Sequence, residues 1–237
     1  MKLQLQPTMK TIILCASIAG LLTTAANAAN VTWQAPGTIS GAADVSTAGT
    51  LYGSWAPGDV HNPDVLPVNG VNFLAFGTPG VNFGINGANL NLDHYDGFAN
   101  PNTANANYNF IMQNSLFNWN NTPMTLTWNS MTAGDTYLVQ MWLNDGRGGQ
   151  SGSSTFTGGA NTSASVVIGN GAPGQYIIGT FVADGSGSQD VLISPGIMLN
   201  LVQVRDLTTV PEPSALALLA TGAGAIFIGF RRKNLAI

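Results

Sequence analysis

The chain has 237 residues, of which eleven are acidic and seven are basic, and it contains one cysteine. Between Ala29 and Val210 there is no lysine and no glutamate, and ten aspartates are opposed only by Arg147 and Arg205. An acidic surface of this kind has nothing to neutralise phosphate, which argues against nucleic acid and anionic lipid as partners. The single cysteine excludes an internal disulfide and argues against thiolate metal sites.

The chain begins with the pattern of a secretory signal peptide. A basic start is followed by the apolar run Thr11–Leu22 and by a small-x-small cleavage site formed by Ala26 and Ala28. We therefore expect residues 1–28 to direct the chain to the Sec export machinery. Signal peptidase would then cleave before Ala29.

Residues 29–209 predict one exported domain built almost entirely of β-strands. Lys and Glu, the usual residues of exposed helical faces, are absent, whereas Gly, Asn, Thr and Ser are abundant. Asn69-Gly70 separates two apolar runs, which is the signature of a tight hairpin. Short strands are also expected at Val31–Trp33, Asp44-Val45, Leu51–Trp55, Phe83–Ile85 and Leu90–Leu92. The stretch from Tyr108 to Trp119 fits either a hairpin or a short helix.

The second half of this domain alternates with a period of two, which is typical of half-buried antiparallel strands. The alternating sets are Met124, Leu126 and Trp128; Tyr137, Val139, Met141 and Leu143; Tyr176, Ile178, Thr180 and Val182; and Ile197, Leu199, Leu201 and Gln203. Turn signals such as Gly134-Asp135 and Asp184-Gly185 separate these runs. The sequence therefore predicts an all-β fold, an antiparallel β-sandwich.

One path through this half resembles the C-terminal half of galactose-binding-like jelly rolls. It runs through Tyr137–Asn144, a glycine-rich loop, Gln175–Ala183, Val191–Ser194 and Leu199–Asp206, and its first strand has the form Tyr-x-Val-x-x-Trp. The resemblance implies a jelly-roll-like sandwich. It does not imply a ligand, because members of that fold class differ in what they bind.

The loop Asn144–Gly149 is the first candidate ligand site. In a sugar-binding interpretation, Asp145 accepts hydroxyl hydrogens, Arg147 donates through its fork, and Trp55, Tyr95 or Trp142 stacks on the ring. In the alternative interpretation, the loop is a glycine-rich hairpin, Arg147 is a solvated charge and Trp142 belongs to the core.

A second candidate is a calcium site in the loop from Asp184 to Asp190, which offers two carboxylates and several other oxygens. A turn without metal is the alternative. We expect no other cofactor.

Motifs for catalysis are absent from the sequence, which has neither Gly-x-Ser-x-Gly nor His-Glu-x-x-His. The two histidines, His61 and His94, lie in loop-like segments beside aspartates such as Asp59, Asp64, Asp93 and Asp96. Most of the aspartates lie at turn positions, where the side chain caps the backbone. We therefore expect a protein that is not an enzyme.

The end of the chain has three parts. Pro211, Glu212 and Pro213 form an extended box, because proline restricts both its own backbone and that of the preceding residue. Ser214–Phe230 contains no charge and is about 26 Å long as a helix, enough for a thin bilayer core. A basic cluster follows, formed by Arg231, Arg232 and Lys233.

This tripartite tail, residues 210–237, resembles the PEP-CTERM sorting signal of Gram-negative bacteria, which an exosortase reads. The resemblance implies export across the inner membrane, transient anchoring by a transmembrane helix, cleavage near the box, and release to the cell surface or extracellular matrix. An ordinary single-pass anchor is the alternative.

For the exported domain, three function classes stay open. The first is a structural or adhesive protein associated with exopolysaccharide in a biofilm matrix, the second is a carbohydrate-binding module, and the third is a secreted hydrolase. The tail and the acidic surface favour the first.

Overall fold

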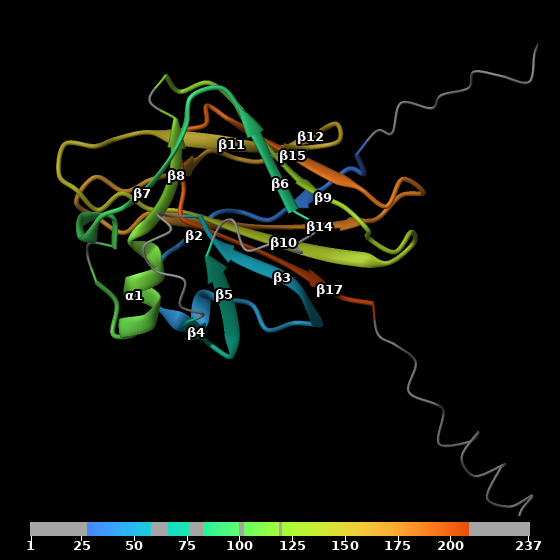
Figure 1. Ribbon diagram of the computed structural model, residues 1–237, viewed down its shortest axis with the longest axis horizontal. Coiled ribbons are helices and arrows are strands. Elements are labelled where there is room, and N and C mark those ends of the chain that lie inside the picture. The colour runs from blue at the N-terminus through green and yellow to red at the C-terminus, as the bar shows by residue number, and fades with distance from the viewer. Residues whose placement is uncertain (1–27, 58–65, 76–82, 100–101, 119, 209–237) are drawn as a thin grey trace, which may run out of the picture.

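The computed structural model describes residues 28–57, 66–75, 83–99, 102–118 and 120–208 (Figure 1). The expected signal peptide, the Pro-Glu-Pro box and the apolar tail lie outside these residues. Within them, no helix has the length and apolar character needed to cross a membrane.

The described residues form three β-sheets with few helical turns (Figure 1). The eight-stranded sheet contains β1 (Thr32–Trp33), β2 (Gly37–Thr38), β3 (Thr50–Ala56), β4 (Leu66–Val68), β5 (Val71–Ala75), β10 (Thr136–Leu143), β14 (Gln175–Val182) and β17 (Leu201–Asp206). The six-stranded sheet contains β6 (Phe83–Gly87), β9 (Met124–Trp128), β11 (Ser153–Gly158), β12 (Asn161–Thr162), β13 (Val166–Val167) and β15 (Gln189–Ser194). The three-stranded sheet contains β7 (Leu90–His94), β8 (Asn114–Asn118) and β16 (Met198–Leu199). The helical elements are α1 (Ala106–Met112) and two 3-10 turns, η1 (Ala42–Asp44) and η2 (Asp96–Ala99).

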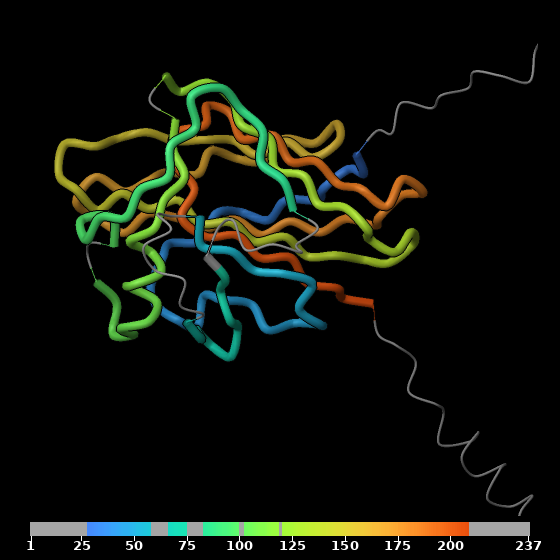
Figure 2. Tube along the Cα trace, viewed as in Figure 1, coloured from blue at the N-terminus to red at the C-terminus, as the bar shows by residue number. Residues whose placement is uncertain are grey.

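The two larger sheets pack face to face, so the predicted all-β sandwich is confirmed. Their inner faces share one hydrophobic cluster that includes Val139 and Ile177 from the eight-stranded sheet and Leu126, Phe156 and Val191 from the six-stranded sheet. Among the strands that the structure describes, pairing is antiparallel except where β3 runs parallel to β5; an isolated parallel bridge also joins Asp145 to Gly169. Figure 2 shows that β3, near the start of the chain, lies beside β17, near its end, in agreement with their antiparallel pairing.

The outer face of the eight-stranded sheet is also covered, which the sequence did not predict. A second cluster places Tyr108 and Ile111 of α1 and Phe73 of β5 against Trp142 and Leu201. As a result, β10 is not half-buried. Its side chains from Tyr137 to Leu143 are all buried, and its apolar alternation separates two cores rather than core from solvent.

Polar side chains on this covered face hold the segment before β3. Gln203 Nε2 donates to Gln140 Oε1 at 2.7 Å, and Gln140 Nε2 donates to the Asp44 carbonyl at 2.7 Å. Arg205, which is 7% exposed, donates through Nη2 to the Gly49 carbonyl at 2.8 Å. Burial lowers the pKa of Arg205.

Several local predictions are confirmed and others are wrong. The Asn69-Gly70 hairpin joins β4 to β5, with both residues at positive φ (49° and 75°), as a type I′ turn requires. The strand predicted at Asp44-Val45 is a 3-10 turn instead, because the Asp44 carboxylate accepts the Ser40 and Gly41 backbone N–H groups at 2.6 and 2.9 Å.

The ambiguous stretch from Tyr108 to Trp119 contains a helix, α1, followed by a strand, β8. Asn105 caps the helix by accepting the Tyr108 N–H at 2.8 Å. The expected glycine-rich loop after Asn144 contains β11, β12 and β13. Their Ser, Thr and Gly residues gave no clear apolar pattern, and β11 forms by pairing with β15.

Two alternating sets were assigned wrongly. In β14 the buried face consists of Ile177, Gly179 and Phe181, and the opposite set is only partly buried or exposed. The run from Ile197 to Gln203 is divided between β16 and β17, with buried Asn200 at the break. The Asn200 side chain bonds to other elements, as described below.

The two ends of the described body lie at the same end of the sandwich, on the right in Figure 1. The last described residues are hydrogen-bonded to the start of β10. Leu207 N–H donates to the Thr136 carbonyl at 2.7 Å, and Thr136 N–H donates to Thr208 Oγ1 at 2.9 Å. The carboxyl end of β10 is therefore at the opposite end of the sandwich from the exit toward the tail.

Candidate functional site

The loop after β10 forms one wall of a pocket at that opposite end. Its backbone bonds to two other segments: Asp145 N–H donates to the Ile168 carbonyl, and Gly146 N–H donates to the Phe98 carbonyl at 3.3 Å. The Asn170 N–H donates to the Asp145 carbonyl, also at 3.3 Å. These bonds hold the loop against η2 and against the segment that leads to β14.

Two buried asparagines position the base of this loop. The Asn144 N–H donates to Asn200 Oδ1 at 2.6 Å, and Asn144 Oδ1 accepts the Gly174 N–H at 2.7 Å. Asn144 Nδ2 donates to the Phe98 carbonyl. Asn200 Nδ2 donates to the carbonyls of Met112 and Asn114 at 3.1 and 3.0 Å. The two side chains thus join β10 and β17 to α1, β8 and η2.

An ion pair lies on this base. Arg147 donates through Nε to Asp145 Oδ1 at 2.8 Å and through Nη2 to Oδ2 at 2.5 Å. The carboxylate is 2% exposed, whereas the Arg147 side chain is 37% exposed. Hydrogen bonding to Asp145 raises the pKa of Arg147, and partial burial opposes the rise. The pair is therefore fixed on its acidic side and open to solvent on its basic side.

Aromatic rings of η2 and the residue before it surround the guanidinium. The Arg147 Cζ atom lies 4.7 Å from the Phe98 ring centroid and 5.7 Å from that of Tyr95, distances at which a cation interacts with a ring face. Gly97 makes this approach possible, because a Cβ there would lie 2.9 Å from Arg147 Cγ and closer still to the Tyr95 ring.

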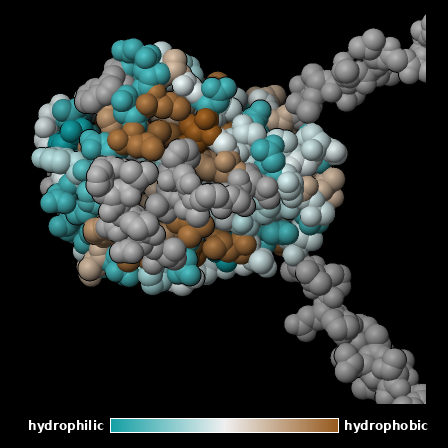
Figure 3. Space-filling model, in the orientation of Figure 1, coloured by the Kyte–Doolittle hydropathy of each residue, from teal (hydrophilic) through white to brown (hydrophobic). Residues whose placement is uncertain are grey.

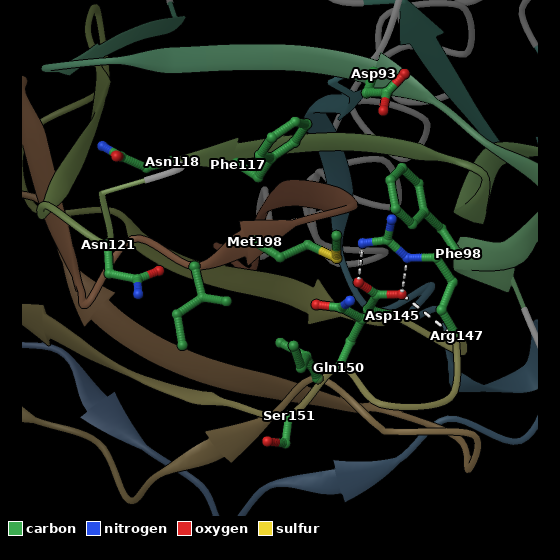
Figure 4. Close-up of a pocket in the computed structure, with 12 residues that line it drawn as sticks. Asp93, Phe98, Phe117, Asn118, Asn121, Asp145, Arg147, Gln150, Ser151 and Met198 are labelled. Atoms are coloured by element: carbon green, nitrogen blue, oxygen red, sulfur yellow. Dashed lines mark hydrogen bonds and ion pairs between the residues drawn. The ribbon is translucent and has the colours of Figure 1, made fainter.

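The pocket has a volume of about 250 Å³ (Figure 4). Its described lining comes from five regions of the chain: Asp93 and Phe98; Phe117, Asn118 and Asn121; Asp145, Arg147, Gln150 and Ser151; Ile168; and Ile197 and Met198. Figure 4 shows Asp93 on a separate strand from the one that leads to Asp145, with Arg147 facing Asp145. In Figure 3, hydrophilic side chains predominate at the left-hand end of the molecule. The loop between β10 and β11 lies at this end in Figure 1.

The structure brings together three of the five residues predicted for the ligand site. Tyr95, which is 51% exposed, lies beside Asp145 and Arg147. Trp55 and Trp142 are buried, with 2% and 0% exposure. Trp55 stacks on Phe83 in the inter-sheet core and Trp142 packs on Phe73 in the second cluster, so neither ring is available for stacking on a sugar.

Local sequence patterns do not indicate that Asp93, Phe98, Asn121 and Gln150 line this pocket. In the sequence, Asp93 stands out only as a neighbour of His94. No spacing in the sequence connects these residues, because they converge through the pairing of β7 with β8 and the docking of η2.

The predicted calcium ligands lie apart from this pocket. Asp184 Oδ1 accepts the Ser186 N–H at 2.8 Å in a local turn, and Asp190 Oδ1 accepts Thr127 Oγ1–H at 2.6 Å. Both aspartates border an open depression beside Ala28 and Ala29. The described residues include no group of three or more His, Cys, Asp or Glu side chains arranged to hold a metal ion. The calcium site stays a prediction.

The histidine considered for catalysis has a different partner. His94 Nδ1 lies 3.0 Å from Asn114 Oδ1, and its ring packs on Phe110. His61, Asp59 and Asp64 lie outside the described residues.

Comparison with known protein families identifies the tail. Residues 209–233 match the PEP-CTERM protein-sorting motif. This match confirms the resemblance seen in Pro211, Glu212 and Pro213 and in the basic end of the chain. A PEP-CTERM motif implies an exported protein that an exosortase processes. Among curated protein sequences, none matches this chain.

Three solved structures show limited similarity. A family 35 carbohydrate-binding module from Clostridium thermocellum has 14% identity and a TM-score of 0.33, over 52% of this chain and 90% of the module. A xylan-binding domain from Paenibacillus barcinonensis has 10% identity and a TM-score of 0.38, over 70% of this chain and 100% of the domain. An exo-beta-1,3-galactanase from Phanerochaete chrysosporium has 16% identity and a TM-score of 0.32, over 59% of this chain and 32% of the enzyme. Similarity at this level says nothing about a ligand of this chain.

Proposed function

We propose that this PEP-CTERM protein is a non-enzymatic component of the cell surface or biofilm matrix that adheres to exopolysaccharide through its β-sandwich. Sec export and signal peptidase cleavage after Ala28 would precede processing by exosortase. The observation that carries the proposal is the pocket lined by Arg147 and by the buried Asp145 that orients it, with the exposed ring of Tyr95 next to Arg147 but outside the lining.

The chemistry of this pocket suits a sugar ring. A guanidinium has five N–H groups, of which Asp145 uses two, so Arg147 keeps donors for hydroxyl oxygens. Asn121 and Gln150 are exposed at the rim and supply both donors and acceptors. Ile197 and Met198 supply apolar surface. The Tyr95 ring is not part of the pocket lining, but it is exposed beside Arg147, and a ring of this kind stacks on a pyranose that extends from the pocket.

The position of the pocket suits a protein presented from a membrane. The chain leaves β17 at the end where Thr136 and Thr208 are bonded, and the pocket lies at the other end of β10. While the tail is anchored, the pocket would face away from the bilayer. A ligand outside the cell would reach it before and after cleavage.

The carboxylates of this pocket favour binding over hydrolysis. A glycosidase needs two carboxyl groups that act in proton transfer or nucleophilic attack. Both oxygens of Asp145 are occupied by Arg147, which leaves Asp93 as the other carboxylate among the lining residues that the structure describes. A secreted hydrolase is therefore the weaker alternative. Release of reducing ends from a bound glycan would favour it.

The test is a glycan array with the full-length chain in a sugar-free detergent, since an alkyl glycoside would compete for the pocket. We expect retention on defined glycans and a loss of about tenfold in affinity for Tyr95→Ala and for Arg147→Gln. Val182→Ala is the matched control, because Val182 is also exposed but lies at the opposite end of the sandwich. Equal retention of all four proteins would rule out the pocket, and no retention of any would rule out glycan binding.

A further inference from the structure

The pocket carries an unbalanced negative charge. Among the described residues, its lining contains three charged side chains, Asp93, Asp145 and Arg147. Arg147 and Asp145 neutralise each other through their ion pair, which has two hydrogen bonds. Asp93 is partly buried, accepts the His94 N–H at 2.9 Å through Oδ1, and makes no ion pair within the described residues. One carboxylate is thus left without a cationic partner at the wall of the pocket.

Asp93 lies in the wall of the same pocket as Arg147. The hydrogen bond to Asp145 is the largest cause of the raised pKa of Arg147, and the charge of Asp93 adds the smallest contribution. Because the pocket is partly closed from water, its effective dielectric is lower than that of bulk solvent and charge effects there are stronger. A positively charged group of a ligand that enters beside Arg147 would therefore be attracted to the Asp93 carboxylate.

The charges on the rest of the domain add to the negative potential around the pocket. Between residues 29 and 209 there are ten aspartates and two arginines. The second arginine, Arg205, is 7% exposed and is bonded to the backbone carbonyls of Thr47, Ala48 and Gly49, so it adds little positive surface. The long-range field of such a body attracts cations and repels polyanions.

The size of the pocket restricts what enters it. Pockets for drug-sized ligands have volumes of about 300–1,000 Å³. At about 250 Å³ this pocket is smaller and accommodates one sugar ring rather than a length of chain. The residue recognised is then a chain end or a side branch.

We propose that the pocket selects a single sugar residue that carries a protonated amino group, with the ammonium paired to Asp93 and the hydroxyls bound by Arg147 and the rim amides. Uronic acids are disfavoured there, because their carboxylate would enter beside Asp93 and compete with Asp145 for Arg147. This inference rests on the proposed function, since it names the sugar class for the same pocket.

The experiment uses three disaccharide probes: one of glucosamine, its fully N-acetylated form, and one of galacturonic acid. Binding to the full-length chain is measured by calorimetry at pH 6, where the free amine is protonated, in 50 mM salt and sugar-free detergent. We expect the glucosamine probe to bind about tenfold more tightly than the N-acetylated probe, and the galacturonate probe to bind weakest. Added salt should reduce the preference.

Two variants assign the preference to the pocket. Asp93→Asn keeps the size and the acceptor oxygen for the His94 N–H, and it should make the amine and N-acetyl probes bind equally. Asp184→Asn is the control, because it removes the same charge far from the pocket and should keep the tenfold difference.

The outcomes separate this inference from the proposed function. Equal binding of all three probes to the unmodified protein, or an unchanged preference in Asp93→Asn, would overturn the amino-sugar inference and leave glycan binding intact. If no probe binds and the glycan array is also silent, both fail.

Discussion

Arg147 lies two residues after Asp145 in the same loop and binds both oxygens of its carboxylate, at 2.8 and 2.5 Å. The two partners differ in their access to water, because Asp145 is almost fully buried and Arg147 is not. The pair therefore stabilises the loop and presents Arg147 to the pocket through the same contacts.

The first prediction concerns the free energy of unfolding contributed by this pair. Arg147→Ala leaves a buried carboxylate without its cation, and we expect a loss of about 2 kcal/mol; the full cost of an unpaired buried charge is not reached because the site opens to water. The double variant Asp145→Asn with Arg147→Gln should lose less than Arg147→Ala alone. Urea unfolding at pH 7 measures both. A double variant less stable than the single one would contradict the ion-pair account.

The second prediction concerns the buried asparagines at the base of the pocket. Asn200→Ala removes the acceptor of the Asn144 N–H and the donor to two carbonyls, so buried polar groups lose their partners. We expect a loss of about 1–3 kcal/mol in unfolding free energy together with weaker glycan retention. Asn86→Ala, at an exposed position of β6, is the control and should change stability by less than about 0.5 kcal/mol. Equal losses in the two variants would refute the assigned role of Asn200.

The third prediction is a loss of stability at alkaline pH. Burial raises the pKa of Tyr108 above its ordinary value near 10, and the charge of Asp44 raises it further, although Trp142 opposes the rise. Burial and Asp44 also raise the pKa of Tyr176. The folded protein keeps both phenols neutral while the unfolded chain ionises, so stability is complete below about pH 10 and falls as the pH rises above it.

Urea midpoints between pH 8 and pH 11 measure this effect, and Tyr108→Phe provides the comparison. The Tyr108 hydroxyl lies near Trp142 but makes no hydrogen bond of good geometry among the described residues, so the variant should be nearly as stable as the parent at pH 8. Its decline above pH 10 should be shallower, with the part due to Tyr176 remaining. Identical declines would show that Tyr108 does not control the alkaline transition.

The fold was predictable from sequence where local chemistry decides the structure. Asn69-Gly70 determines a hairpin because its two residues accept positive φ, and alternation in β9 gave the correct buried face. Prediction failed where the structure of a segment depends on a partner strand or on a second layer of packing. β11 depends on pairing with β15, and the full burial of β10 depends on α1, which lies about thirty residues earlier in the chain.

The candidate site shows the same division. Asp145 and Arg147 were identified because a polar loop with a fork donor follows an apolar strand. The sequence allows Trp142 either to stack on a sugar or to be buried in the core. Its packing in the second hydrophobic cluster shows that it is buried. Phe98 is not indicated as a pocket residue by any local pattern because its approach to Arg147 depends on η2 and on Gly97, and Asp93 reaches the pocket through the pairing of β7 with β8.

The last prediction tests the sorting tail. The final described residue, Thr208, is hydrogen-bonded to the body, and the Pro-Glu-Pro box begins at Pro211, so only Thr209 and Val210 separate the folded domain from the box. Replacing Pro211, Glu212 and Pro213 by alanine should block processing by exosortase and leave the full-length protein in the membrane fraction. The parent should appear in the released fraction with a mass that lacks the tail. Inserting a Gly-Ser-Gly-Ser spacer after Thr209, with the box intact, is the matched control, since it changes the distance but keeps the motif. Release of the alanine variant at the parental mass would show that the box is not the processing signal, whereas faster release of the spacer variant would show that the folded domain restricts access to it.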